Sequence, residues 1–418
     1  MTVNSGEGPR QKSPSERRSQ PIPMKRETSR SHPKNLMRFC IGSSSFAICG
    51  PQPFCLRFVP RKQKNSAREG RANGRSAMMT TDPNVTDRRA RQSLRFFGAL
   101  SSRQTFLVLI NVAIFITLTV LRPDAFPAWT NLKAVLSLMS YDLLIAVAMT
   151  IVLIVRGIDL SVGSILALSS VTMALLMRAD TPVFAALLAG LCVALACGLI
   201  NGFLVAVVGI LPFLVTLGMM SVARGVATVL TTGQYISFPN APAWFTQFGR
   251  YEVQIPNGSG FYGLPVILII SIATVFITGL LFSRWTPLRS FFFVGESTEA
   301  ARLSGIKVKR LTIAAYLLSA LFVWFTAVLL TSANKIGYAN YGIGSEMRAL
   351  AAAVVGGASL AGGAGNIFGT FLGVLMLALI GNGFVMLNGN PNWQQASVGI
   401  VLIVAVGVDA LRTYRDRR

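Results

Sequence analysis

The sequence predicts an all-α polytopic membrane protein with about ten transmembrane helices, and three observations lead to this prediction. Hydrophobic residues make up 52% of the 418 residues and charged residues only 13%, whereas average globular domains carry about 25% charged residues. From residue 96 onward, apolar runs of about twenty residues recur, which is the length that spans a bilayer as a helix. These runs lack the polar and apolar alternation of a membrane β-barrel.

The N-terminal region, residues 1–95, has a different composition. The chain carries a formal net charge of +23, and about half of its Lys and Arg residues lie in this region among many Ser and Pro. We expect a disordered cytoplasmic tail that is attracted to anionic membrane lipid. The basic stretches lack the fold and the interleaved aromatics of nucleic-acid-binding domains, so no nucleic-acid partner is expected. Met78 and Met79 each begin a conventional short leader and are both candidates for the native start.

The apolar runs place ten spans along the chain, and Gly-rich breaks blur the ends of the last three. The expected spans are residues 104–121, 134–155, 163–177, 183–208, 212–231, 263–283, 312–331, 347–360, 367–387 and 396–411.

The distribution of charge sets the expected orientation of these spans. The connection Ser283–Leu311 carries six Lys and Arg residues against two Glu, whereas Thr232–Tyr262 carries one Arg and one Glu. Because cytoplasmic loops are enriched in Lys and Arg, the first connection is expected inside and the second outside. Counting spans from these loops places both termini in the cytoplasm.

A break in the second apolar region is the most informative feature of the chain. Gly157-Ile-Asp-Leu-Ser-Val-Gly163 interrupts the run and includes Asp159 and Ser161. A carboxylate at membrane depth costs about 2.5–3.5 kcal/mol on insertion scales, so its presence favours a functional role. Gly157 and Gly163 allow a helix to break and another backbone to approach. Asp159 is expected to act in gating or helix capping, or else to contact the substrate.

The basic connection at residues 284–311 contains a short helix in its middle. Ser297 is placed to cap the helix, and Gly305 is placed to end it. Such a helix between two spans is a natural handle for a partner protein, although an ordinary basic loop is the simpler alternative. The residues assigned to this handle are Glu299, Ala300, Ala301, Gly305 and Ile306.

Glycines recur at four-residue spacing after the eighth apolar run, at Gly365, Gly369 and Gly373. This spacing lets helix backbones pack closely. The segment lacks the Gly-Lys-Ser/Thr ending of a phosphate-binding loop, so we do not expect it to bind nucleotide.

Several polar residues lie near or within the spans, where each needs a partner or a water-filled path. Singly they can be structural hydrogen bonds between helices, but as a set they suit a passage for a neutral polyhydroxy solute. They are Asn201, Arg224, Glu346, Gln394 and Gln395. Asp142 is the main counter-indication, because an isolated carboxylate in an apolar helix could bind a proton or sodium.

The spans offer no acid–base or metal-binding constellation, since His32 is the only histidine and lies in the tail. We therefore expect neither an enzyme nor a metal site. The loops are too short for a nucleotide-binding domain, so an ion gradient or another subunit must energise the protein.

Three segments resemble permease subunits of bacterial ABC importers for simple sugars of the ribose, xylose, arabinose and galactose type. They are Gly157–Gly163, Glu299–Ile306 and Glu346–Thr370, and the likeness extends from about residue 100 to the end. Arg348 stands where the family usually has an acidic residue, and Thr286–Val294 departs from the usual sequence before the loop helix.

The resemblance implies the ABC importer permease architecture for residues 96–418, with 284–311 as the loop that couples to an ATPase. It also implies an inner-membrane location, a cytoplasmic ATPase that holds ATP and Mg, a periplasmic sugar-binding protein and a second permease subunit in a homodimer or heterodimer. This chain would bind no cofactor, and the sequence does not name the sugar. The alternative function is an ion-coupled secondary transporter that uses Asp142 or Asp159.

Overall fold

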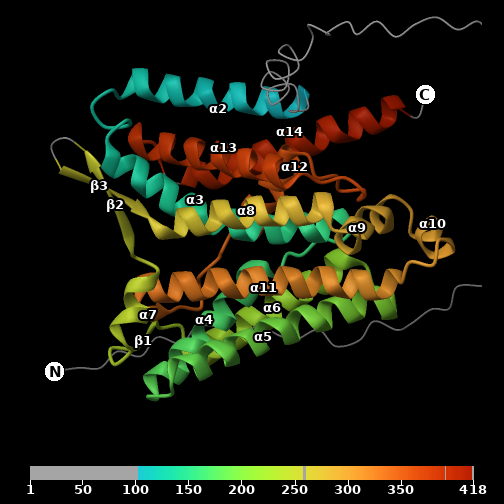
Figure 1. The fold of residues 1–418 in the computed structure, drawn as a ribbon, viewed down its shortest axis with the longest axis horizontal. Helices are drawn as coiled ribbons and strands as arrows, with labels where there is room; N and C mark the ends of the chain where they lie inside the picture. Colours follow the sequence, from blue (N-terminus) through green and yellow to red (C-terminus); the bar gives the residue numbers. More distant parts are fainter. Residues whose placement is uncertain (1–101, 258–259, 391, 417–418) are drawn as a thin grey trace, which may run out of the picture. The chain divides into compact units, whose positions relative to one another are not determined.

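The computed structural model describes residues 102–257, 260–390 and 392–416. The predicted tail, with Met78 and Met79, lies outside these residues. A helix lies at each of the ten predicted spans (Figure 1). These helices are α2 (Ser102–Leu121), α3 (Trp129–Ile154), α4 (Val162–Arg178), α5 (Val183–Phe203), α6 (Pro212–Thr231), α8 (Val266–Arg284), α11 (Val308–Asn334), α12 (Ser345–Gly356), α13 (Ile367–Met386) and α14 (Asn392–Asp416).

Among the described residues, seven helices are long and apolar enough to cross a membrane; α5 counts among them together with the five-residue π-helix η2 (Leu204–Val208) that extends it. The helix α4 and the apolar part of α14 are shorter, and α12 has only 12 residues. The predicted all-α polytopic membrane fold is therefore confirmed.

The structure contains elements that the sequence did not lead us to expect. At one end, strands β2 (Glu252–Asn257) and β3 (Gly260–Pro265) form an antiparallel hairpin beside the short helix α7 (Ala243–Phe248). At the other end, helix α9 (Thr286–Glu296) precedes α10 (Thr298–Leu303) (Figure 1). We call these the hairpin end and the α10 end. A two-residue strand pair, β1 (Ile236–Ser237) with β4 (Ile336–Gly337), joins distant parts of the chain.

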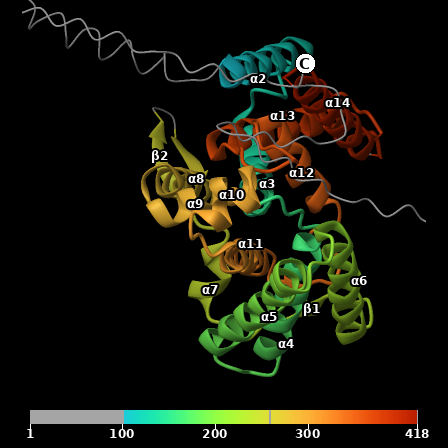
Figure 2. The same ribbon diagram turned by 90° about the vertical axis from the view of Figure 1, so that its right-hand side faces the viewer.

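Helix α3 forms the centre of the described fold. Viewed from the α10 end, α2, α12, α13 and α14 lie to one side and α4, α5, α6 and α11 to the other, with α3 between them (Figure 2). Every residue from Leu143 to Ile154 is buried. This half of α3 is apolar on nearly all sides, which suits its position, because no face of it is exposed.

The chain breaks twice in the interior. After α3 it turns back through residues 155–161 into α4, and after β4 it runs through residues 338–344 into α12. The two breaks meet at Gly163 and Gly342: a Cβ at Gly342 would lie 2.7 Å from the Gly163 carbonyl oxygen, and a Cβ at Gly163 would collide with the Gly342 carbonyl. Any residue larger than glycine would force these backbones apart.

Candidate translocation site and coupling helix

Asp159 lies in a sealed polar cluster within the first break. Its side chain is 1% exposed. One carboxylate oxygen accepts hydrogen bonds from the Ser161 amide at 3.0 Å and the Ser161 hydroxyl at 2.5 Å, and the other accepts from the Ser319 hydroxyl at 3.2 Å. Asn201 donates to the Ser161 hydroxyl oxygen at 2.9 Å. Hydroxyl and amide donors thus satisfy the carboxylate inside the protein.

The cluster lies well inside the helix bundle. Ser319 is the twelfth residue of α11, about 16 Å from the start of that helix at 1.5 Å per residue. Gly157 opens the break under Tyr316, whose hydroxyl would lie 2.9 Å from a Cβ at position 157. The sequence predicted this break at the end of the second span; the structure shows that it continues from that end into the interior.

Arg156 connects this break to the end of α9, directly before α10. It ends α3 with a φ of 64°, a left-handed conformation that is uncommon for a residue other than glycine. The Arg156 amide donates to the Leu153 carbonyl and the Gly157 amide to the Val152 carbonyl. These two hydrogen bonds form the Schellman motif that commonly ends a helix. The Arg156 guanidinium donates to the carbonyls of Gly295 and Glu296, both at 2.6 Å.

A third segment completes this contact. The Gly363 amide donates to the Ile154 carbonyl at 3.0 Å, and a Cβ at Gly363 would lie 2.9 Å from the Glu296 backbone. A Cβ at Gly295 would collide with the Ile154 carbonyl. We call this three-way contact of Ile154–Arg156, Gly295–Glu296 and the loop at Gly363 the α3–α9 junction. In this junction the three backbone segments lie in direct contact with one another.

The predicted loop helix is present as α10. The Ser297 hydroxyl accepts from the Ala300 amide at 3.2 Å, as expected of its cap. Gly305 ends the helix with a φ of 77°, and the Ile306 amide donates back to the Ala301 carbonyl. Ala301 is buried and Ile306 is half-buried, whereas Glu299 and Ala300 are exposed.

The second break opens onto a cavity of about 710 Å³ that both apolar and polar side chains line. Arg224 on α6 donates to the backbone carbonyls of Ala339 and Tyr341 in this break. Glu346, in the first turn of α12, accepts from the Gly344 amide at 3.2 Å. The polar residues that line the cavity are Ser164, Ser221, Arg224, Thr228, Asn340 and Glu346.

Asp142 is not an isolated carboxylate, and the prediction that it stands alone is wrong. Its two oxygens accept from Nε and Nη2 of Arg348 at 2.9 and 3.1 Å. The Arg348 and Asp142 side chains are 30% and 18% exposed. A planar guanidinium matches both oxygens of a carboxylate, which makes such a pair strong and well oriented. The unexpected Arg348 thus supplies the partner that a lone carboxylate in a helix needs.

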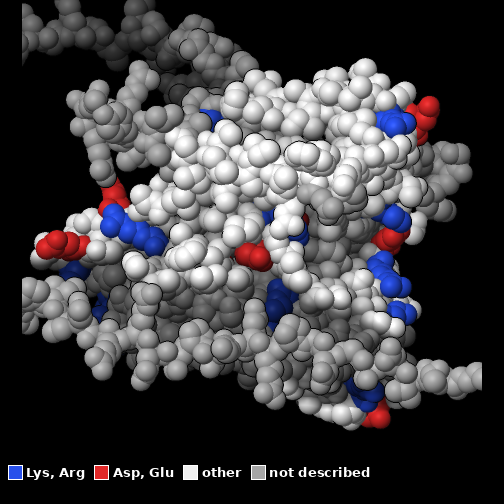
Figure 3. Space-filling view, turned by 180° about the vertical axis from the view of Figure 1, so that it is seen from behind, with Lys and Arg blue, Asp and Glu red and all other residues white. Residues whose placement is uncertain are grey.

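Arg348 also lines a second cavity, of about 390 Å³, together with Gln394 and Gln395. The exposed Ile343 lines both cavities. On the face opposite to that of Figure 1, charged side chains lie mostly toward the edges, with a small group of both signs near the middle (Figure 3). The structure therefore places the predicted polar residues in two groups: Asn201 joins the sealed cluster, and the others line open cavities.

The three spaced glycines make two kinds of contact. Gly369 and Gly373 on α13 face α12, where a Cβ would collide with the carbonyls of Gly356 and Ala352 respectively. Gly365 precedes α13, and a Cβ there would lie 2.6 Å from the Ile154 side chain of α3.

Sequence analysis missed Ser319, Arg156 and Asn340. Ser319 sits in an apolar helix without a distinguishing pattern, and Asn340 lies in a loop. Arg156 is a charged residue directly before the Gly157 break, which was the available signal. Within the described ranges, no group of three His, Cys, Asp or Glu side chains is close enough to hold a metal ion.

The fold and site define a membrane-spanning transport protein with broken helices around polar cavities. Residues 131–406 match the family described as the permease component of branched-chain amino acid transport systems, and the chain belongs to this family of permeases. The ribose import permease protein RbsC of Bacillus subtilis is 33% identical over 316 residues, covering 76% of this chain and 95% of that protein. The D-allose transport system permease protein AlsC of Escherichia coli is 33% identical over 310 residues, covering 73% and 90%. The probable ABC transporter permease protein y4mJ of Sinorhizobium fredii is 34% identical over 323 residues, covering 77% and 93%. No solved structure matches.

Proposed function

We propose that this chain is the transmembrane permease subunit of an ATP-driven ABC importer for a simple sugar. The observation that carries the proposal is the alignment, over at least nine-tenths of their length, with permeases named for ribose import and D-allose transport. A periplasmic binding protein would deliver the sugar, and a separate cytoplasmic ATPase would hold ATP and Mg. A second permease subunit, identical or homologous, would complete the passage.

The α10 helix suits the role of ATPase-docking element. Its inner side is fixed by the buried Ala301 and by Ile306, which packs against the core. Its outer side presents Glu299, Ala300 and Leu303, and Leu303 is 86% exposed. This outer side would offer a partner protein one apolar side chain, Leu303, and one carboxylate, Glu299.

The α3–α9 junction gives α10 a route to the interior. A movement of α10 acts on Glu296 two residues before it, and the Glu296 and Gly295 carbonyls are held by Arg156. Arg156 is three residues from Asp159 in the first break. Because tightly packed backbones transmit displacement with little compression, the junction would carry ATPase motion to the breaks.

The open cavities suit a neutral polyhydroxy solute. The cavity at the second break offers hydroxyls, an amide, a guanidinium and a carboxylate, and mixed donors and acceptors match sugar hydroxyls. Asp159 would support the break and gate it rather than bind the sugar, since its carboxylate is sealed. Gly157, Gly163, Ser161 and Asn201 would hold that support in place.

The charge distribution supports one orientation of the subunit in the bacterial inner membrane. The α10 end carries the basic connection and would face the cytoplasm together with both termini, and the hairpin end would face the periplasm. In that orientation the ATPase meets α10, and the binding protein meets the opposite end.

A co-purification experiment tests the proposal. The chain is expressed with a candidate ATPase as wild type, as Glu299→Lys and as Asp124→Lys, a matched reversal of an exposed acidic residue in the turn between α2 and α3. We expect the wild type and Asp124→Lys to co-elute with the ATPase. Glu299→Lys should retain at least about tenfold less ATPase, because a reversed charge at an interface is repulsive. Failure of every ATPase of this class to associate in lipid nanodiscs would refute the importer assignment; equal association of both variants would refute the role of Glu299.

A further inference from the structure

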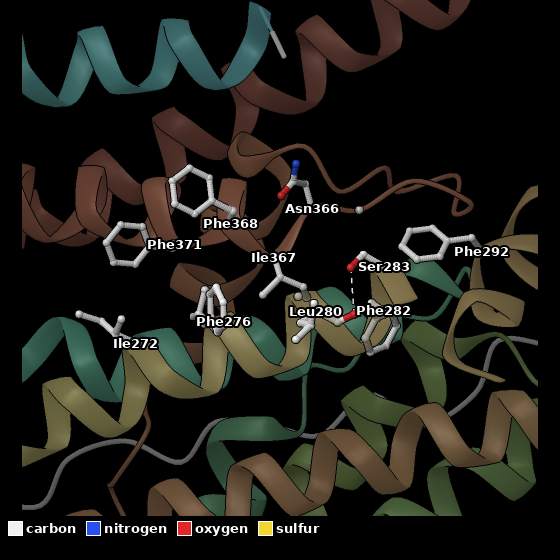
Figure 4. A pocket seen from close by; sticks show the side chains of 13 residues that line it. Ile272, Phe276, Leu280, Phe282, Ser283, Phe292, Asn366, Ile367, Phe368 and Phe371 are labelled. Atoms are coloured by element: carbon white, nitrogen blue, oxygen red, sulfur yellow. Dashed lines mark hydrogen bonds between the residues drawn. The ribbon is translucent and has the colours of Figure 1, made fainter. Parts of the chain in front are cut away.

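An apolar groove runs along the outside of the fold between α8 and α13. Its volume is about 630 Å³. Most of the labelled side chains that line it are aromatic or aliphatic, and they come from α8, from α13 and, for Phe292, from α9 (Figure 4). Phe276 is 71% exposed and Phe368 is 47% exposed. Such side chains need an apolar neighbour.

The groove continues into a polar cavity at the α10 end. The two cavities share Phe292, Gly365 and Asn366 as lining residues. The second cavity, about 300 Å³ in volume, adds Arg103 and Gln104 from the start of α2. The apolar groove therefore ends at the Arg103 guanidinium. It thus joins an apolar subsite to a positively charged one.

The length of the groove matches one leaflet of a bilayer. Its lining on α8 extends from Ile272 to Ser283, which is about 16 Å along a helix at 1.5 Å per residue. Half of the hydrocarbon core is about 15 Å thick. The exposed Arg284 and Trp285 follow directly, and such residues mark the headgroup level of a membrane.

We propose that this groove binds an anionic phospholipid. One acyl chain lies between α8 and α13, and the headgroup phosphate lies against Arg103. The apolar lining excludes a sugar, whose hydroxyls would find few partners there. The guanidinium favours an anionic headgroup, because it can donate to a phosphate and also balance its charge.

Gly279 provides a variant that fills the groove. It lines the groove, and a Cβ at this position would meet only Ile367, at 3.9 Å. Gly279→Leu therefore places a side chain in the acyl subsite without straining the backbone. Gly218→Leu is the matched control, because Gly218 is an exposed glycine of α6 whose Cβ would meet nothing within 4 Å.

Arg103 provides a variant of the headgroup subsite. It donates to the Val354 carbonyl at 2.7 Å, so its replacement can also disturb packing. Arg103→Lys keeps the charge and serves as the second variant beside Arg103→Gln. Arg310→Gln is the control for charge, because Arg310 is an exposed basic residue in the first turn of α11.

Native mass spectrometry of the purified chain, titrated with dioleoyl phosphatidylglycerol or phosphatidylcholine, measures binding and oligomeric state together. We expect Gly279→Leu to weaken phosphatidylglycerol binding by about tenfold, since several methylene contacts are lost, and Gly218→Leu to leave it unchanged. Arg103→Gln should abolish the preference for phosphatidylglycerol, and Arg103→Lys and Arg310→Gln should retain it.

Three results would overturn the proposal. The first is equal binding by Gly279→Leu and its control. The second is loss of the preference for phosphatidylglycerol when free inorganic phosphate is added, which would make Arg103 an anion-binding site that does not require a lipid. The third is a loss of oligomer in Gly279→Leu with an unchanged lipid count, which would assign the groove to a second copy of the chain.

Discussion

The two interior breaks lie side by side but have opposite surroundings. Each breaks the chain before a short helix, α4 or α12, and they touch at Gly163 and Gly342. At the first break Asp159 is 1% exposed and bonded to hydroxyls. At the second, Ile343 is 59% exposed and lines two cavities, and charged side chains surround it.

From this difference we expect the first break to support the fold and the second to border the passage for the solute. The free amides at the start of a helix attract oxygen atoms. At the first break Asp159 accepts from one amide, that of Ser161 directly before α4. At the second break Glu346 accepts from the Gly344 amide directly before α12, and it also lines an open cavity. We therefore expect the first break to keep its shape while the second admits the solute.

The largest expected effect comes from forcing the two breaks apart. A Cβ in Gly163→Ala would collide with the Gly342 carbonyl and lie 2.8 Å from a Glu346 carboxylate oxygen. We expect a loss of about 3 kcal/mol of stability or more, the upper end of the usual cost of overpacking, because the obstacle is backbone. Thermal unfolding followed by fluorescence-detected size exclusion measures it. Gly218→Ala is the control, and equal midpoints for the two variants would show that the contact does not stabilise the fold.

A smaller effect is expected from the ion pair beside the second break. Asp142→Asn leaves Arg348 without its carboxylate partner, and we expect a loss of about 1–3 kcal/mol of stability. This cost is below that of breaking a fully buried ion pair, because both side chains are partly exposed. The exchange of both residues, Asp142→Arg with Arg348→Asp, should recover part of that loss.

Uptake measurements on the same variants separate pairing from ion coupling. If Asp142 acts only as the ion-pair partner of Arg348, transport should fall with stability in Asp142→Asn and recover with it in the exchanged pair. Loss of uptake in a fully stable Asp142→Asn protein, without recovery in the exchanged pair, would instead favour transport driven by an ion at Asp142.

The sequence predicted the elements whose cause is local. A run of apolar residues forms a span because of its own length, and Ser297 caps α10 because its hydroxyl reaches an amide three residues away. The break at Gly157–Gly163 was also predictable, because two glycines and a carboxylate within an apolar run disfavour a continuous membrane-spanning helix.

The partners of these residues were not predictable, because they come from distant parts of the chain. Ser319 meets Asp159 across 160 positions, and Arg348 meets Asp142 across 206. Such contacts depend on how ten helices pack, which apolar periodicity does not determine. The division between a sealed and an open break followed from that packing, so it became visible only in the structure.

The smallest expected change in stability is also the sharpest test of the comparison. Glu346→Gln removes a charge from an open cavity, so we expect a stability change within about 0.5 kcal/mol and a large loss of sugar uptake. Asp159→Asn replaces an acceptor oxygen by a donor NH₂ that faces other donors, at a cost of about 1–3 kcal/mol for the unmade bonds. Uptake per folded molecule should fall less in Asp159→Asn than in Glu346→Gln. Proteoliposome uptake, normalised to folded protein, measures this order. The reverse order would mean that Asp159 contacts the solute during transport, and that the sealed break opens in a state this structure does not show.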